Sequence, residues 1–251
     1  MDVIAIREFE YWASGTTEPT KARLALGKPE YDGEAWIAPY EIHGISPEPM
    51  RKGSWGEDAV QALLLSFEII GVFLDRPGGR LTLAGSAGAP WNHGLPPRAE
   101  LYPQAVTDLQ AELAGYLAAE SPAQGPPIED ARPADDRGVG VIAIREFEYL
   151  APGATEPTKA RLVLRRPEYD GQAWAAPYEI HGITLDPIRQ AAWGEDAVQA
   201  LLLSFETIYA DLDVFGASLT LAGSEGAPWD HGLPRRAGTM EREHGLRRAQ
   251  G

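Results

Sequence analysis

The alternation of apolar and polar residues predicts a small antiparallel sheet at the start of the chain. Residues 3–12 and 20–26 alternate and are rich in β-branched, aromatic and leucine side chains, which is typical of half-buried strands. The pair Asp32-Gly33 lies between 20–26 and a third strand at 35–43, and Asp-Gly at such a position indicates a hairpin turn. Pro39 cannot donate to a ladder, so we expect it at a sheet edge or a bulge.

The clearest predicted helix spans residues 57–74. Its apolar residues follow the 3, 4, 7 spacing of one buried stripe, formed by Val60, Leu63, Leu64, Phe67, Gly71 and Leu74. Glu57 and Asp58 lie in its first turn, where carboxylates favour the positive end of the helix dipole. We interpret 45–54 as a loop and 80–84 as a fourth strand. The predicted fold is α+β: three strands, one helix packed on the sheet, then the fourth strand.

This pattern occurs twice in the chain. Val3–Ala99 returns at Val141–Ala237 with a constant offset of 138 and no gap, and about 71 of roughly 97 aligned residues are identical. The sequence therefore predicts two tandem domains, at 1–98 and 140–237. The second repeats the order with strands near 141–150, 158–164 and 173–181, a helix at 195–212 and a strand at 218–222.

Three other segments are predicted to lie outside the two domains. Residues 99–120 place apolar side chains at helical spacing, which indicates an amphipathic connecting helix. Residues 121–139 are rich in Pro, Asp and Gly, and this composition predicts a disordered acidic linker. We expect the tail, 238–251, to be disordered as well.

Charge and composition narrow the classes of function. The net charge is −15, to which the first copy contributes −3, the second −6 and the segment 100–140 another −6. Binding to nucleic acid needs clustered Lys and Arg, so an acidic chain argues against it and instead suits a basic protein partner. Acidity also simply keeps a protein soluble. With no Cys, no signal peptide and no membrane-spanning apolar run, we expect a cytoplasmic protein without cofactor, thiolate metal site or disulfide.

Several short motifs resemble those of an uncharacterised family of small bacterial domains of about one hundred residues. The shared features are Trp36-x-x-Pro39-Tyr40, the helix start Gly56-x-Asp58-x-x-Gln61-Ala62-Leu63, and the ending Leu95-Pro96. In the family pattern a Cys commonly follows the Trp, whereas Ala38 and Ala176 stand there in this chain. The resemblance implies a compact bacterial domain and no particular reaction, and any function that needs that thiol would be absent.

One set of residues suits catalysis or metal binding. Glu41 and His43 are two residues apart on a strand and share a face. With His93 or Asp58 they would supply an acid–base pair or a metal site. The second copy repeats the set as Glu179, His181, His231 and Asp196. No metal-binding spacing such as HExxH is present, so we predict no resident metal. The alternative is a solvated strand face with a histidine at a loop tip.

Positions that differ between the copies indicate a contact surface. Ile69, Val72 and Phe73 form a stripe that we place on the far side of the helix, and it becomes more polar in the second copy, where Asp211 replaces Phe73. The connecting helix within 103–119 would cover it, or an external partner or a contact between the two copies would. Trp55 and Trp193 are interpreted as core or rim anchors that also suit an interaction site.

The leading hypothesis is a non-enzymatic bacterial protein-interaction module in tandem duplicate, of the type that neutralises a basic partner as immunity proteins do. The alternative is a hydrolytic or metal-assisted enzyme that uses Glu41, His43 and His93 or their equivalents. A duplicated domain also allows the two copies to pair within the chain as an intramolecular pseudo-dimer.

Overall fold

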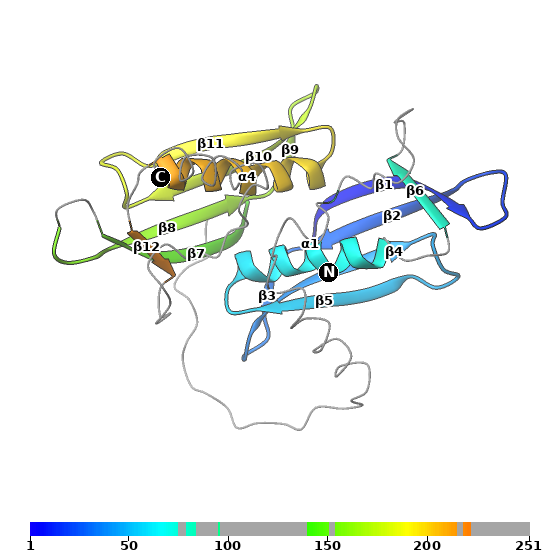
Figure 1. Cartoon of the computed structure of the whole chain (residues 1–251), viewed down its shortest axis with the longest axis horizontal. Coiled ribbons are helices and arrows are strands. Elements are labelled where there is room, and N and C mark those ends of the chain that lie inside the picture. The colour runs from blue at the N-terminus through cyan, green and yellow to red at the C-terminus, as the bar shows by residue number, and fades with distance from the viewer. Residues whose placement is uncertain (75–78, 84–94, 96–139, 151–153, 215–217, 222–251) are drawn as a thin grey trace, which may run out of the picture.

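The computed structural model describes residues 1–74, 79–83, 95, 140–150, 154–214 and 218–221 (Figure 1). The predicted connecting helix at 99–120, the linker at 121–139 and the tail at 238–251 lie outside these residues. No helix in the described part of the chain is both long enough and apolar enough to cross a membrane.

The first copy folds into an antiparallel sheet with one helix on it. Strand β5 pairs with β4, β4 with β2, β2 with β1, and β1 with β6, while the short β3 pairs with the start of β4. Helix α1 packs over β4 and β5. The elements are β1 (Val3–Ala13), β2 (Thr20–Gly27), β3 (Glu30–Tyr31), β4 (Trp36–His43), β5 (Met50–Gly56), α1 (Ala59–Leu74) and β6 (Gly79–Leu83).

The second copy repeats this topology, strand for strand. Its elements are β7 (Val141–Leu150), β8 (Thr158–Arg165), β9 (Glu168–Tyr169), β10 (Trp174–His181), β11 (Ile188–Gly194), α4 (Ala197–Val214) and β12 (Ser218–Leu221). The predicted α+β fold, duplicated in tandem, is therefore confirmed.

The predicted Asp-Gly turn forms the hairpin between β3 and β4. Asp32 Oδ1 accepts hydrogen bonds from the backbone N–H groups of Glu34 and Ala35, both at 2.9 Å. These bonds lower the pKa of Asp32, with the bond from Ala35 contributing most. Gly33 adopts a φ of +112°, a conformation that glycine tolerates and side-chain-bearing residues rarely adopt. The bonds that hold this turn thus come from its own residues.

One local prediction was wrong. Residues 45–54 do not form only a loop, because β5 begins at Met50 and runs to Gly56. Its inward positions are the small residues Ser54 and Gly56, and its large Trp55 is exposed, so the strand lacks the apolar alternation that would predict it. Pro39 lies in the interior strand β4 and is paired with Gly53 of β5. On the other side the β4–β2 ladder stops at the adjacent pair, Tyr40 with Leu26, so Pro39 has no ladder partner in β2.

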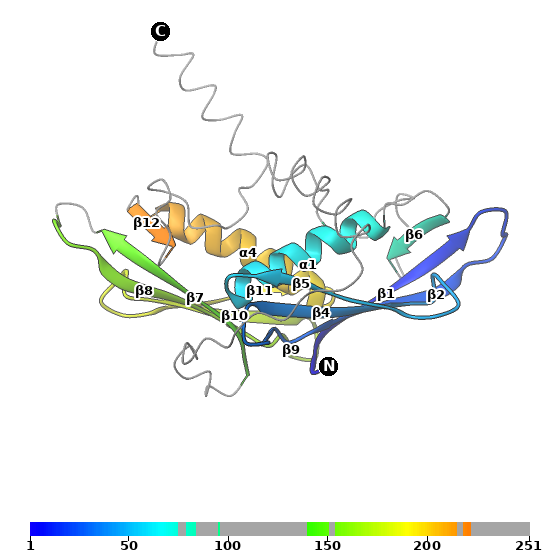
Figure 2. The same ribbon diagram turned by 90° about the horizontal axis from the view of Figure 1, so that it is seen from below.

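The two copies share one hydrophobic core. Figure 2 shows both helices on the same side of the two sheets. All six residues of the predicted stripe on α1 are buried, and buried residues of both copies belong to one continuous cluster. α1 also contacts β7, and α4 contacts β1, so each helix packs on its own sheet and on the first strand of the other copy. This arrangement creates the junction described next.

Candidate functional sites at the junction and on the outer sheet faces

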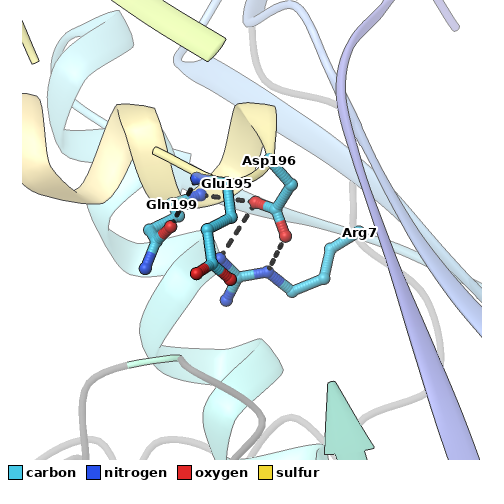
Figure 3. A network of polar contacts seen from close by, with 4 residues as sticks. All are labelled: Arg7, Glu195, Asp196 and Gln199. Carbon is cyan, nitrogen blue, oxygen red and sulfur yellow. Dashed lines mark hydrogen bonds and ion pairs between the residues drawn. The ribbon is translucent and has the colours of Figure 1, made fainter. Parts of the chain in front are cut away.

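Arg7 on β1 connects the first copy to the second. Its side chain is 1% exposed and lies on the same side of the strand as the buried Phe9. Nε donates to Oδ2 of Asp196 at 2.8 Å, and Nη2 donates to Oδ1 at 3.0 Å (Figure 3). Two parallel bonds between a guanidinium and a carboxylate form the most specific arrangement available to this pair of side chains.

The reverse contact uses the equivalent residues. Arg145 on β7 is also 1% exposed, and its Nε and Nη2 donate to Oδ2 and Oδ1 of Asp58 at 2.8 and 3.1 Å. Arg145 is the counterpart of Arg7, and Asp58 is the counterpart of Asp196, at the repeat offset of 138. The junction is therefore reciprocal, with each copy supplying one arginine and one aspartate.

Each aspartate also caps the helix that it precedes. Oδ1 of Asp196 accepts the backbone N–H of Gln199 at 2.7 Å, and Oε1 of Gln199 accepts the backbone N–H of Glu195 at 2.6 Å (Figure 3). The first copy repeats both bonds at 2.7 and 2.6 Å through Asp58 and Gln61. This exchange satisfies N–H groups at the helix start that have no partner within the helix.

Gly56 and its counterpart Gly194 allow the strand to approach the helix start. A Cβ atom at Gly56 would collide with the backbone nitrogen of Ala62. The motif Gly-x-Asp-x-x-Gln-Ala-Leu thus has a physical explanation: the glycine permits close packing, Asp and Gln cap the helix, and the Asp carboxylate faces the other copy. The most specific motif of the sequence therefore both starts its own helix and contacts the other copy.

Phe67 and Phe205 meet in the apolar part of the junction. Their rings are 6.3 Å apart between centroids and inclined by 73°, an edge-to-face contact. They are equivalent residues of the two copies. Equivalent residues that contact each other lie close to the two-fold axis of a pair, so this contact marks the local axis relating the copies.

One contact of the junction is not reciprocal. Arg166 donates from Nη2 to both carboxylate oxygens of Asp2 at 2.8 Å and from Nη1 to the backbone oxygen of Val3 at 2.9 Å. The hydrogen bond from Arg166 is the main cause that lowers the pKa of Asp2. The counterpart of Arg166 in the first copy is Lys28, and the counterpart of Asp2 in the second copy is Gly140. Glycine has no carboxylate, so the equivalent ion pair cannot form.

The structure brings Glu41 and His43 together on the outer face of β4, away from the helix. His43 Nε2 lies 2.8 Å from Glu41 Oε2, and Arg51 Nε donates to Glu41 Oε1 at 3.0 Å. The hydrogen bond with His43, then that with Arg51, holds the pKa of Glu41 below its usual value. A general base works best with a pKa near the operating pH, and these partners shift Glu41 the other way.

In the second copy the equivalent carboxylate, Glu179, lies near three basic side chains. Glu179 is 3.0 Å from His181 Nε2 and 2.7 Å from Arg165 Nη2, with Arg189 Nε at 3.7 Å. Burial raises the pKa of Glu179, but the hydrogen bonds and charges of Arg165 and His181 outweigh burial and lower it. Both carboxylates are therefore held ionised in ion pairs.

The third members of the predicted catalytic sets, His93 and His231, lie outside the described residues. Within the residues that the structure does describe, no three His, Asp or Glu side chains gather closely enough to hold a metal ion.

Trp55 and Trp193 are exposed on the same strand of each copy. Their exposed fractions are 51% and 53%, and they face away from the helix, since their neighbours Ser54 and Gly56 in the first copy are buried beneath it. β5 and β11 have one ladder partner each within the described chain, β4 and β10. The interpretation of these residues as core anchors does not fit this exposure, whereas a surface position does.

The stripe on α1 lies nearer its own sheet than we expected. Ile69 and Phe73 are half-buried and pack against the core. In the second copy Asp211, the counterpart of Phe73, accepts a hydrogen bond from the hydroxyl of Tyr178 on β10 at 2.6 Å. This position therefore faces the sheet and is not on the far side of the helix. The segment 103–119, which we expected to cover the stripe, is outside the described residues.

Sequence reasoning missed the arginines of the junction. Arg7 and Arg145 occupy strand positions whose neighbours two residues away, such as Phe9, point inward. An arginine in the inward register of both copies is the signal that would have revealed them, because a buried charge needs a partner. No local pattern indicates that the partner lies in the other copy.

Comparisons with known proteins place the chain in a family. Searches of curated proteins and of solved structures each found no match. A family model described as a domain of unknown function, DUF6968, matches residues 5–90 and again residues 143–230. The two matches fall within the two copies recognised from the repeat. The chain therefore belongs to the DUF6968 family and contains two tandem copies of its domain.

Proposed function

We propose that this chain is a non-enzymatic bacterial protein-interaction module, and that its two copies act as one pseudo-dimer that binds a basic partner protein. The observation that carries the proposal is the pair of half-exposed tryptophans, Trp55 and Trp193, at equivalent outward positions. Tryptophan is enriched among residues that dominate binding energy, because its large ring buries much area at little entropic cost.

The reciprocal junction supports a two-site mode of binding. Buried Arg–Asp pairs fix the two copies relative to one another, so the two tryptophans are held at a constant separation. A partner with two matching sites would gain avidity from this arrangement without any new contact. The proposed pseudo-dimer thus gives the duplication a function that a single domain lacks.

Charge supports a basic partner. Both copies are acidic, at −3 and −6, within a chain of net charge −15. Opposite net charges speed the encounter of two proteins and disfavour acidic competitors. Neutralisation of a basic protein, as immunity proteins perform it, is one function of this kind.

The alternative is a hydrolytic or metal-assisted enzyme that uses Glu41 and His43. Its support is the short contact between these side chains, which both copies repeat. We favour the interaction module because arginines also hold each carboxylate, at Arg51 in the first copy and Arg165 in the second.

Site-specific photo-crosslinking tests the proposal. A photoreactive phenylalanine analogue would replace Trp55, Trp193 or, as a control, the fully exposed Leu185, in the cells that naturally make the protein. We expect positions 55 and 193 to capture the same basic protein and position 185 not to capture it. The purified captured protein should bind the Trp55→Ala/Trp193→Ala chain at least tenfold more weakly, while Glu41→Gln/Glu179→Gln leaves binding unchanged.

Two results would contradict the proposal. One is that no protein is enriched at positions 55 and 193 over position 185. The other is that binding of the captured protein depends on Glu41 and Glu179 and not on the tryptophans, which would favour the enzyme.

A further inference from the structure

The junction has the form of an isologous interface, in which two partners use the same surface. Arg7 contacts Asp196 and Arg145 contacts Asp58, which is the same contact made in both directions. Phe67 contacts its own counterpart, Phe205. An interface with a two-fold axis is self-complementary, so each partner contains both halves of every contact.

The residues that make these contacts are identical in the two copies. The first copy contains Arg7, Asp58, Gln61 and Phe67, and the second contains Arg145, Asp196, Gln199 and Phe205. The glycines that let each strand approach the helix start, Gly56 and Gly194, are also shared. Nothing in this set distinguishes a first copy from a second copy as a partner.

We propose that the junction is a homotypic dimer surface: a copy released from its partner within the chain pairs with an identical copy from another molecule through the same Arg–Asp bonds. A pair of two first copies would join each Arg7 to the Asp58 of its partner. A pair of two second copies would join Arg145 to Asp196 in the same way. This inference is independent of any external partner and of the tryptophans.

The contact between Arg166 and Asp2 sets the expected preference among pairs. It is present once in the native pair, whereas two first copies would oppose Lys28 to Asp2, and two second copies would oppose Arg166 to Gly140. Both side chains are well exposed, and exposed ion pairs contribute little to stability. We therefore expect the mixed pair to be favoured by less than about tenfold over the statistical ratio.

The test begins from the intact, folded chain. A specific protease site is placed within 121–139, the purified chain is cleaved, and isotopically labelled and unlabelled samples are mixed to verify that halves exchange. Native mass spectrometry then separates the three kinds of pair by mass. We expect first–first, mixed and second–second pairs to approach a ratio of 1:2:1, with at most about a tenfold excess of the mixed pair. Exchange that yields mixed pairs alone would overturn the proposal.

Complementary charge variants of the uncleaved chain provide a second test. One chain carries Arg7→Asp and Arg145→Asp, and the other carries Asp58→Arg and Asp196→Arg, so neither can close its own junction. Mixing the two should give a 1:1 complex and, if either chain is unfolded alone, recovery of its helical signal. A control chain with Arg7→Asp and Asp196→Arg has complementary charges within its own junction. It should bind neither of the two variant chains. Two variants that stay separate on mixing would also overturn the proposal.

Discussion

At the scale of single residues, positions that differ between the two copies show which side chains the fold accepts there. Phe73 packs against the core of the first copy, while Asp211 at the same position accepts the hydroxyl of Tyr178. Burial, then the bond with Asp211, raises the pKa of Tyr178, so its hydroxyl stays a donor. One site on the helix thus accommodates either an apolar ring or a carboxylate that accepts a hydrogen bond from the neighbouring tyrosine.

The first prediction is that Phe73→Asp destabilises the protein less than Phe73→Ala. Both changes lose apolar contacts, but the new carboxylate would accept a hydrogen bond from the buried Tyr40, and bonds to charged groups contribute about 1.5–3 kcal/mol. We expect a difference of about 1 kcal/mol in the free energy of unfolding, measured in urea, with both changes costing less than the 2–5 kcal/mol typical of Leu63→Ala. The same comparison in a chain that also carries Tyr40→Phe is the control, because the hydroxyl that donates the bond is then absent. If Phe73→Asp is still more stable than Phe73→Ala in that chain, this explanation is wrong.

The second prediction concerns pH. The pKa of Glu41 lies below its usual 4.5 in the folded protein, because of His43 and Arg51. Ionised Glu41 therefore adds stability above about pH 4.5, and this contribution is lost as the pH falls through the lower pKa of the folded state. Glu41→Gln removes it.

Urea unfolding between pH 6 and pH 3 measures this effect. We expect the stability of Glu41→Gln to fall less steeply below about pH 4.5 than that of the unaltered chain. Parallel curves would show that His43 and Arg51 do not hold the carboxylate in solution.

At the scale of elements, the start of each helix has two functions. Asp58 caps α1 through Gln61 and also holds Arg145 of the other copy. The cap restricts the Asp58 side chain, so less conformational freedom remains to be lost when Arg145 binds it. A cap that is also an interface residue connects local folding with assembly.

The third prediction separates these two functions at Asp58. Asp58→Ser and Asp58→Ala both lose the contact with Arg145, but serine still caps the helix. We expect Asp58→Ala to be the less stable by about 1 kcal/mol, the usual contribution of a cap. Differential calorimetry measures this difference, and the matched pair Asp196→Ser and Asp196→Ala should repeat it. Equal stability of the serine and alanine variants would show that the side chain does not cap.

The elements that sequence predicted are those whose own residues carry the signal. β1, β2, β4 and both helices show the period of their structure, and Asp32-Gly33 specifies its turn. β5 was missed because its buried side needs small residues beneath the helix. The pairing of Glu41 with His43 followed from strand periodicity alone, whereas the partner of Arg7 is set by the packing of distant segments, which no local pattern encodes.

At the scale of the whole molecule, the two sides of the Arg–Asp pair are unequal. The side chain of Arg7 is 1% exposed and that of Asp196 is 27% exposed. Removal of one partner from a buried pair costs roughly 3–5 kcal/mol, because water does not replace the counter-charge that the remaining group has lost. The cost should therefore depend on which residue is removed.

The fourth prediction is that Asp196→Ser destabilises more than Arg7→Met. Serine keeps the helix cap but leaves the buried guanidinium without the Asp196 carboxylate, whereas Arg7→Met leaves a carboxylate that still reaches water and still caps α4. The double variant should cost less than the sum of the two, by at least about 1 kcal/mol, as expected for residues in direct contact. Urea denaturation measures all three. A larger loss for Arg7→Met would mean that Arg7 contributes mainly through packing.

The reciprocal junction has a consequence for how the protein behaves at low abundance. Two separate chains that met through this surface would come apart on dilution, since their pairing would depend on concentration. Joining the two partners in one polypeptide replaces that dependence with a fixed effective concentration, which is set by the connecting segment and not by the number of molecules. The closed pair is then equally populated in a cell that contains ten molecules and in one that contains ten thousand.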